Sequence, residues 1–244
     1  MKILSWNILA NEFIKQSYYD MIPSHILFNR HKRQERIIET LKEANPDIML
    51  LQEVMQSEYN KLADEFQKTY HLIKGKHIHW QNKRSYSGNV ILLRKSMFSL
   101  PNNQLDLNFG MAIQVQLKEK IEIPILLINI HLDDLSQAKR LRQIKDLEML
   151  FQNHSCIVLG GDFNEHYHPK HITKLYNKLK EYYFTITNHA VTYYIKSKVS
   201  IDHILLKGFE NNKISKVINE YGNNSVEHFT HYGSDHLPVL LTIQ

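Results

Sequence analysis

Short apolar runs recur along the whole chain, and this pattern is the strongest constraint on the fold. We predict strands at 2–9, 47–54, 88–94, 111–118, 123–132, 155–160, 201–207 and 238–243. In 111–118, apolar and more polar residues alternate, which is typical of a strand buried on one face. Other runs are continuously apolar, as in the central strands of sheets that are covered on both faces.

Between these runs, apolar residues recur at helical spacing, which predicts amphipathic helices. Many connections between the runs are too short for helical crossovers. We therefore expect mixed sheets with helices outside them, in one α/β domain over 1–244. The helices are expected at 37–44, at 59–66 after Ser57 as N-cap, at 141–151 after Ser136, and at 172–179 with Pro169 near the start.

The composition favours one intracellular domain. With 244 residues, of which 43% are hydrophobic, the chain can bury one large core. No apolar stretch reaches the roughly 18 residues that a membrane span needs, so no membrane association is expected. A single cysteine, Cys156, allows no disulfide within the chain. This favours a reducing compartment, and we expect a cytoplasmic protein, with the nucleus as an alternative. The net charge of +5 favours a polyanionic partner.

Polar side chains stand at or beside the ends of six of the apolar runs. One such group is ordinary, but six in a chain of packed strands suggest that they converge on one rim. A buried carboxylate or carboxamide is costly unless it is paired or solvated, so such a rim is expected to handle a charged ligand. The residues are Asn7, Glu53, His131, Asp162 with Asn164, Asp202, and Asp235 with His236.

These residue types suit metal-assisted hydrolysis of a phosphoester. Carboxylate and amide oxygens are hard ligands, so Glu53 with neighbouring carboxylates suits Mg²⁺ or Mn²⁺ rather than zinc. Asp162 can orient and deprotonate a water. Asp202 can keep His236 protonated at neutral pH, and the imidazolium can stabilise the charge of a developing phosphorane.

Taken singly, most of these residues also have an ordinary structural interpretation. Asn7 alone is more often a structural amide, and Asp235 before a proline-containing run could be a turn residue. Glu53 alone could be the solvated end of a strand. The segment "GGDFN" at 160–164 is the exception, and the whole set in its order is harder to explain in this way.

The ordered motifs resemble the endonuclease/exonuclease/phosphatase superfamily. They occur in the family's order and span nearly the whole chain. The resemblance implies a DNase I-like four-layered α/β sandwich, in which two mixed β-sheets pack face to face with helices outside. The matching segments are "SWNIL" with Asn7, "LQEV" with Glu53, "IHL" with His131, "GDFN" at 161–164, "IDHI" at 201–204 and "SDH" at 234–236.

The resemblance also implies where a metal ion and the attacking water are held. Glu53 would hold the Mg²⁺, which Mn²⁺ is expected to replace, with Asn7 beside it. Asp235 would lie near this metal or at a second metal position. Asp162 would orient the nucleophilic water.

The remaining motif residues would contact the scissile phosphate. By the same resemblance, Asn164 would position the phosphate, and His131 and His236 would contact its oxygens. Asp202 would orient His236. With Asp162, these residues make up the expected catalytic set.

Within the superfamily, the motifs are nearest to those of the deadenylase, nocturnin and 2′-phosphodiesterase branch. The opening "SWNILANEF", the stretch with Tyr and Pro after it, and "VTYYIKSKVSIDHILL" resemble that branch, whereas "HLDD" replaces the aromatic residue that the branch tends to carry. The resemblance implies a Mg²⁺-dependent phosphodiesterase of nucleic acid with single-stranded RNA as the favoured substrate. It would be a 3′ exonuclease or a 2′,5′-phosphodiesterase.

Other functions remain open at this point. Small tyrosyl-DNA phosphodiesterase-like members show similar motifs, so a DNA-repair phosphodiesterase or an abasic-site endonuclease is one alternative. A small-molecule phosphatase is another. A non-enzymatic nucleic-acid-binding protein is disfavoured because every position of the motif set is filled.

Candidate substrate contacts lie outside the motifs. Basic and aromatic residues meet in 74–84, where Lys76 and Arg84 could follow a phosphate backbone while Trp80 stacks on a base. Tyr193 could stack on a base near the site. We expect the protein to act as a monomer.

Two further polar segments are assigned to other roles. The basic segment 138–145 is expected to be the solvated face of the third helix. The histidines of "HYHPKH" at 166–171 lack the closely spaced second pair that a zinc site needs, so contact with substrate is favoured over zinc binding.

Overall fold

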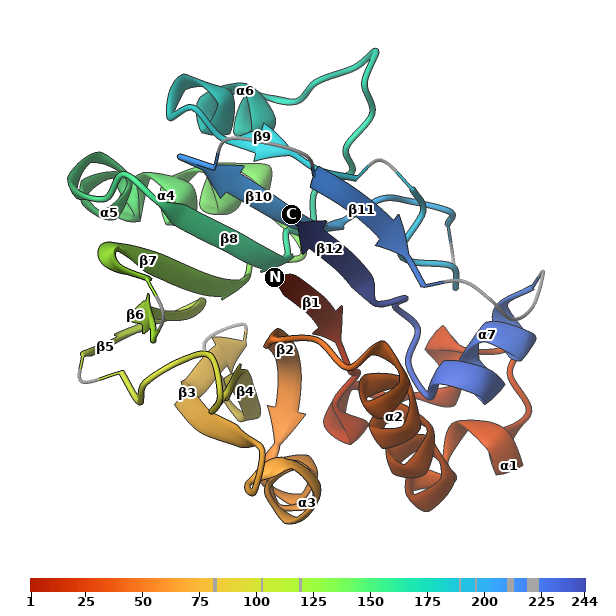
Figure 1. The fold of residues 1–244 in the computed structure, drawn as a ribbon. Helices are drawn as coiled ribbons and strands as arrows, with labels where there is room; N and C mark the ends of the chain where they lie inside the picture. The colour runs from red at the N-terminus through yellow and green to blue at the C-terminus, as the bar shows by residue number, and fades with distance from the viewer. Residues whose placement is uncertain are drawn as a thin grey trace.

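The computed structural model describes residues 1–80, 83–101, 103–118, 120–188, 190–195, 197–209, 213–218 and 224–244. Its architecture is two six-stranded sheets that face each other, with helices on the two outer sides (Figure 1). This confirms the four-layered α/β sandwich that the motifs imply. No helix in the described ranges is both long and apolar enough to cross a membrane.

Each sheet combines parallel and antiparallel pairs. The strands β1 and β2 run parallel, as do β7 and β8, and the other neighbours are antiparallel. The order in the first sheet is β11 (Lys213–Val217), β12 (Val239–Ile243), β1 (Lys2–Asn7), β2 (Ile48–Met55), β4 (Lys83–Arg94) and β3 (Tyr70–Trp80). The order in the second sheet is β5 (Gln104–Leu107), β6 (Gly110–Leu117), β7 (Lys120–His131), β8 (Ile157–Asp162), β10 (Asp202–Lys207) and β9 (Thr185–Ile186).

Three apolar layers hold the sandwich together. Between the sheets, Leu50 of β2 and Leu127 of β7 belong to one fully buried cluster. On the outer face of the first sheet, Trp6 of β1 shares a buried cluster with Leu41 of α2, and α2 (Arg30–Ala44), α3 (Gln56–Phe66) and α7 (Ser225–Tyr232) cover this face. On the outer face of the second sheet, Leu159 of β8 shares a buried cluster with Phe151 of α5, and α4 (Gln137–Asp146), α5 (Glu148–Asn153) and α6 (Lys174–Glu181) cover this face. Burial of both faces explains why the central strands are apolar throughout.

The predicted strands all form, and the four strands that were not predicted are the four edges of the two sheets. These are β3 and β11 in the first sheet and β5 and β9 in the second. An edge strand has one strand neighbour and an open side, and polar and charged residues there discourage pairing with other chains. The segment "YHLIKGKHIHW" of β3 therefore lacks the apolar signal of a central strand.

The predicted helices form with corrected ends, and α1 (Ser24–Leu27) and α7 are additions. Ser57 is not an N-cap, because α3 begins at Gln56 and Met55 precedes it. The third helix is two helices, since α4 ends at Asp146, and Leu147 is both the C-cap of α4 and the N-cap of α5. Ser136 is confirmed as the N-cap of α4, where its side chain accepts a hydrogen bond from the Lys139 N–H.

The prediction that 138–145 is a solvated face is wrong for Arg140. This side chain is buried and forms an ion pair with Glu165, with 2.5 Å between Nη2 and Oε2. Arg140 lies one turn before the buried Ile144, on the side of α4 that faces the protein. Its spacing of four residues from Ile144 is that of the inward side of a helix, but its charge led to the wrong assignment.

Candidate active site

The sheet pairing brings the polar strand ends to one rim. Because β7 and β8 are parallel, their last residues, His131 and Asp162, lie opposite each other. Because β10 is antiparallel to β8, its first residue, Asp202, also faces Asp162. Asn7 ends β1 in the facing sheet, next to β2, which carries Glu53. The convergence that the sequence suggested thus follows from strand direction.

Asn7 connects the two sheets at this rim. Its Nδ2 donates hydrogen bonds to Glu53 Oε1 at 2.8 Å and to Asp162 Oδ2 at 3.0 Å. Its Oδ1 accepts from the Leu9 N–H at 3.0 Å, and this bond fixes which end of the amide faces the carboxylates. Asn7 therefore presents a donor toward the centre of the site and positions both carboxylates.

Two imidazoles flank Asp162. His131 Nε2 lies 3.6 Å from Asp162 Oδ2 and 3.9 Å from Glu53 Oε1. His236 Nε2 lies 3.8 Å from the same Asp162 oxygen. The other oxygen, Oδ1, accepts from the backbone N–H of Asn164 at 2.8 Å. One buried carboxylate is thus surrounded by donors from four separate segments.

The backbone at two site residues is in the left-handed region. Glu53 has φ 58° and Asn164 has φ 48°. At Glu53, the pairing of β2 with β4 shifts register between Leu51 and Val54, so the strand is irregular there. Such conformations cost about 1–3 kcal/mol each and persist where surrounding contacts enforce them. Asparagine is enriched in this conformation, so Asn164 carries a weak signal for it, whereas glutamate at position 53 carries none.

Glu53 is held by the backbone of the segment after β1. Its Oε2 accepts from the Ala10 N–H at 2.8 Å. Burial raises the pKa of Glu53 above its ordinary value, while His131 and the hydrogen bonds from Asn7 and Ala10 oppose that rise. A carboxylate with this environment gains from a bound cation, which removes the cost of the buried charge.

Asp202 and His236 form the pair that the sequence predicted. Their Oδ2 and Nδ1 atoms are 2.8 Å apart and both side chains are buried. Burial raises the pKa of Asp202 to about 6, and the charge of His236 opposes that rise. Burial alone would lower the pKa of His236, but Asp202, Asp235 and Asp162 raise it well above the ordinary value. His236 is therefore a protonated donor at neutral pH.

The Asp202–His236 pair should behave as one unit in mutagenesis. We expect Asp202→Ala and His236→Ala to lower kcat by similar factors, and the double variant to resemble the worse single variant. The reason is that loss of either partner already removes the oriented, charged imidazole. Turnover numbers of the four proteins under saturating substrate test this. Losses that multiply in the double variant would show that the two residues act independently.

Asp235 completes the rim together with a tyrosine that sequence reasoning missed. Tyr19 Oη donates to Asp235 Oδ2 at 2.9 Å. Burial, followed by the charge of Asp235, raises the pKa of Tyr19, so the hydroxyl remains a donor. Asp235 Oδ1 is buried without a hydrogen-bond partner among the described residues. Tyr19 lies far from the strand ends in sequence, and its residue type alone gives no signal.

The donor set fits a hard divalent cation. The trio Asp162, Asp202 and His236 has ligand atoms within 4.8 Å of one another. However, protonated His236 has no lone pair for a metal, so this trio is better explained as a charged hydrogen-bond network. The carboxylate oxygens of Glu53 and Asp235, including the unpartnered Oδ1, match the all-oxygen coordination of Mg²⁺ or Mn²⁺.

A cluster of buried amides lies beneath the rim and fixes the two sheets relative to each other. Gln52 Nε2 donates to Asn129 Oδ1 at 2.7 Å, across the sheet interface. Asn129 Nδ2 in turn donates to the carbonyls of Leu51 and Val90 at 3.0 Å each. Because Gln52 directly precedes Glu53, this network helps to set the position of the Glu53 backbone.

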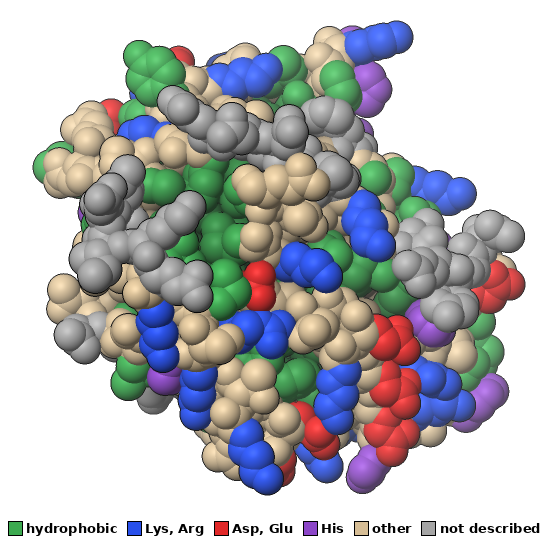
Figure 2. Space-filling view, in the orientation of Figure 1, with side chains coloured by type: hydrophobic (Ala, Val, Ile, Leu, Met, Phe, Trp, Pro, Cys, Tyr) green, Lys and Arg blue, Asp and Glu red, His purple; other side chains and the backbone are tan. Residues whose placement is uncertain are grey.

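The candidate substrate contacts are only partly described. The side chains of Lys76, Trp80 and Arg84 lie outside the described part of the structure. Tyr193 does lie at the site, with its ring centroid 5.1 Å from that of His236. On the face shown in Figure 2, Lys and Arg side chains are spread out with acidic side chains among them.

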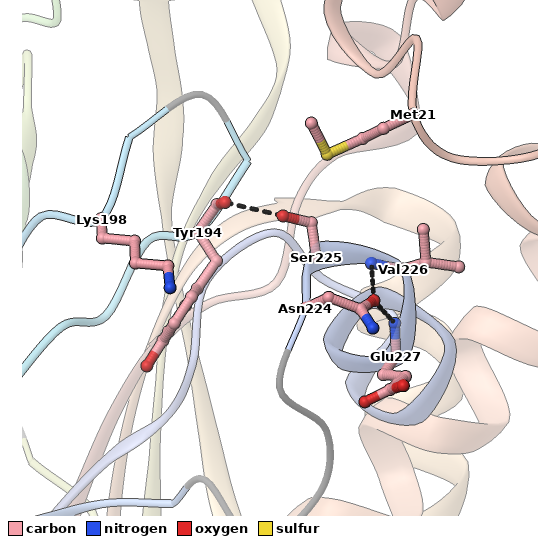
Figure 3. A pocket seen from close by; sticks show the side chains of 7 residues that line it. All are labelled: Met21, Tyr194, Lys198, Asn224, Ser225, Val226 and Glu227. Carbon is pink, nitrogen blue, oxygen red and sulfur yellow. Dashed lines mark hydrogen bonds between the residues drawn. The ribbon is translucent and has the colours of Figure 1, made fainter.

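The structure has two surface pockets of interest. One, of about 630 Å³, lies between Met21, Tyr194 and the start of α7 (Figure 3). There, Ser225 Oγ donates to the Tyr194 carbonyl at 2.8 Å. The other, of about 480 Å³, is lined by Asn164 and by the histidines His166, His168 and His171. Within the described residues, these histidines do not form a cluster of three metal ligands.

Comparison with known proteins defines the class of this site. The sequence matches the endonuclease/exonuclease/phosphatase family over residues 4–236. A stretch of 120 residues is 31% identical to the "CCR4-Not complex 3'-5'-exoribonuclease subunit Ccr4" of Emericella nidulans, covering 45% of this chain and 17% of that protein. The Neosartorya fischeri protein of the same description is 31% identical over 118 residues, which is 44% of this chain and 15% of that protein. The chain thus spans less than a fifth of these relatives.

Solved structures share the fold over nearly the whole chain. ANGEL2, described as a 2′,3′-cyclic phosphatase, has a TM-score of 0.78 at 17% identity, covering 98% of this chain and 93% of that one. The mannosyl-6-phosphatase Bt3783 of Bacteroides thetaiotaomicron has a TM-score of 0.71 at 15% identity, covering 99% and 98%. TDP2 from C. elegans has a TM-score of 0.64 at 17% identity, covering 98% and 74%.

The fold and the rim of carboxylates and imidazoles define a phosphoester hydrolase. The chain belongs to the endonuclease/exonuclease/phosphatase family, and the family match includes every predicted catalytic and metal-site residue, from Asn7 to His236. Its members are hydrolases that act on phosphoesters, and metal binding is typical of this family.

Proposed function

We propose that the protein is a Mg²⁺-dependent phosphodiesterase that removes nucleotides from the 3′ end of single-stranded RNA. The reaction type rests on one observation above all: the buried carboxylate of Asp162 is flanked by His131 and His236 across the rim from Glu53. The choice of RNA is supported by the 31% identity to relatives described as 3′-5′ exoribonuclease subunits.

In this proposal Asp162 is the general base. Its Oδ2 accepts from Asn7 and its Oδ1 from the Asn164 N–H, so the carboxylate is fixed before a water binds. It orients the attacking water and takes its proton. Asn164 follows on a left-handed turn and presents its side chain to the phosphate; in the present geometry its Nδ2 donates to the Leu132 carbonyl at 3.0 Å.

His236 and His131 are assigned to the phosphate oxygens. His236 is kept charged by Asp202, so its Nε2–H can donate to the oxygen on which negative charge develops. His131 comes from the end of β7, the strand beside β8, and its Nε2 lies 3.6 Å from Asp162 Oδ2. Both donors are held on strand ends by buried contacts and need little reorganisation during the reaction.

Glu53 would hold the Mg²⁺, and Asp235 would lie near this metal or at a second metal position. Asn7 orients Glu53 through the hydrogen bond to Oε1. When bound, Mg²⁺ polarises a phosphoryl oxygen and offsets negative charge in the transition state. Mn²⁺ is expected to substitute because it shares the preference for oxygen ligands.

Tyr193 is proposed to stack on a base of the substrate. Its ring lies beside that of His236, with 5.1 Å between the ring centroids. Lys76, Trp80 and Arg84 are proposed to extend this contact along the nucleic acid. We further propose that the enzyme acts as a monomer in a reducing compartment, where buried Cys156 remains a core thiol.

A substrate panel tests this function. With Mg²⁺, we expect linear single-stranded poly(A) to be shortened stepwise from a free 3′ hydroxyl and to release 5′-mononucleotides. A circular RNA of the same sequence serves as the control and should remain intact, because it has no end. Preferred cleavage of 2′,5′-oligoadenylate would favour the related 2′,5′-phosphodiesterase.

Three outcomes would contradict the RNA assignment. Preferred cleavage of an abasic DNA duplex or of a 5′-tyrosyl DNA end would indicate a DNA-repair enzyme. Hydrolysis of small phosphomonoesters without any polymer cleavage would indicate a phosphatase. Cleavage of circular RNA would show endonucleolytic rather than 3′ exonucleolytic action.

A further inference from the structure

Arg33 is a buried cation whose hydrogen bonds all end on neutral oxygens. It lies in the first turns of α2 and is only 5% exposed. Nε donates to the Gly233 carbonyl at 2.7 Å, and Nη1 donates to Asn11 Oδ1 at 2.5 Å. Nη2 donates to the carbonyls of Leu9 at 2.6 Å and Ile8 at 3.3 Å. Burying a charge among neutral groups is costly, so this placement calls for a physical reason.

The carbonyls that Arg33 contacts belong to peptide groups that bond to the active site. The Leu9 carbonyl and the Ala10 N–H form one planar trans peptide group, so they point in opposite directions. The carbonyl accepts from Arg33, and the N–H donates to Glu53. The positive charge of Arg33 at the carbonyl polarises the peptide group, and this strengthens the hydrogen bond that the N–H donates to Glu53.

A second peptide group repeats this arrangement. The Ile8 carbonyl accepts from Arg33, while the N–H of the same group, that of Leu9, donates to Asn7 Oδ1. The Asn7 amide then donates to Glu53 and Asp162. Leu9 has φ 55°, so this segment adopts a left-handed conformation that external bonds must stabilise.

Arg33 also holds the segment that carries Asp235 and His236. Gly233 has φ 74°, and a Cβ at this position would lie 2.7 Å from the Arg33 carbonyl oxygen. The next residue, Ser234, donates through Oγ to the Asn7 carbonyl at 2.7 Å. One guanidinium therefore joins two loops. The first follows β1 and bonds to Glu53 through the Ala10 N–H, and the second follows α7 and carries Asp235.

The charges of the site are consistent with this role. Among the described residues, the rim holds four buried carboxylates, those of Glu53, Asp162, Asp202 and Asp235. Burial lowers the pKa of Arg33 to about 10, with Asp235 opposing the change, so Arg33 stays charged at neutral pH.

We propose that Arg33 is a positioning residue for the divalent-cation site, acting through the 8–9 and 9–10 peptide groups to hold Asn7 and Glu53 and through Gly233 to hold Asp235. This inference rests on the proposed Mg²⁺ dependence. Residues that orient metal ligands typically change metal affinity 10–100-fold when they are replaced.

Calorimetric titration of the full chain with Mg²⁺ tests the proposal without measuring activity. We expect Arg33→Lys to bind Mg²⁺ about 10–100-fold more weakly than wild type, because an ammonium cannot reach the same oxygens as the planar fork. The matched control is Arg94→Lys. Arg94 also donates several hydrogen bonds, to Asp47, Asn45 and Pro46, but at the opposite ends of β2 and β4. Its replacement should leave Mg²⁺ affinity unchanged.

A second variant covers the case in which Arg33→Lys does not fold. Asn11→Ala removes the acceptor of Nη1, together with the bond from Asn11 Nδ2 to Glu58, and leaves the other Arg33 bonds in place. It should weaken Mg²⁺ binding in the same direction by a smaller factor. If the folded variants lose thermal stability but bind Mg²⁺ as wild type does, Arg33 has only a structural role and the proposal is wrong. If the wild-type chain itself binds no Mg²⁺, the proposed Mg²⁺-dependent function is wrong as well. Mg²⁺ binding by the wild type therefore distinguishes failure of the proposed function from failure of the proposed Arg33 role.

Discussion

Replacing Asp162 by Asn is expected to lower turnover by about 10²–10⁴-fold, the usual contribution of a general base. The change keeps the size of the side chain and one carbonyl oxygen, but it removes the group that takes the proton from the attacking water. Asp162 lies at the centre of the site, bonded by Asn7 and by the Asn164 N–H. No other described carboxylate lies in the same position between His131 and His236.

The effect should appear in kcat and leave the fold intact. Turnover at saturating substrate measures the loss of catalysis, and the midpoint of thermal unfolding shows whether the fold is intact. Asp64→Asn is a matched control, since Asp64 is exposed on α3 away from the rim, and this variant should retain wild-type turnover. A turnover of Asp162→Asn equal to that of wild type would exclude Asp162 as the base.

Removal of divalent cations is expected to abolish hydrolysis, and Mg²⁺ should restore it. The expectation follows from the buried oxygens of Glu53 and Asp235. Asp235 Oδ1 accepts no hydrogen bond among the described residues and lies 3.9 Å from His236 Nε2. Assays in EDTA, followed by titration with Mg²⁺ and Mn²⁺, measure it. Full activity in EDTA would falsify the metal-dependent mechanism.

The requirement for Mg²⁺ should also depend on pH in a defined direction. Burial raises the pKa of Glu53, so in the absence of metal this group takes up a proton at a higher pH than an ordinary glutamate. A proton and Mg²⁺ compete for the same oxygens. The Mg²⁺ concentration for half-maximal activity should therefore rise as the pH falls, and Mg²⁺ binding should release protons. A half-maximal concentration that does not change with pH would contradict this assignment of Glu53.

The central strands could be predicted because burial on both faces demands continuous apolar residues. The strands β2 and β7 show this signal directly. The edge strands could not be predicted in this way, since β3 and β11 have an open side and tolerate lysine and histidine. Likewise, the charge of Arg140 suggested solvent, whereas its partner Glu165 is distant in sequence and became visible only in the folded chain.

By itself, the sequence determined the fold class and the chemical groups of the site. Motif order and strand ends were sufficient, because the ends of neighbouring strands meet at one edge of a sheet. Only the tertiary structure decided how those groups interact: the direction of the Asn7 amide, the left-handed backbone at Glu53, and the contacts of Tyr19 and Arg33. These features depend on contacts between segments far apart in the chain, and such contacts cannot be predicted from local residue patterns.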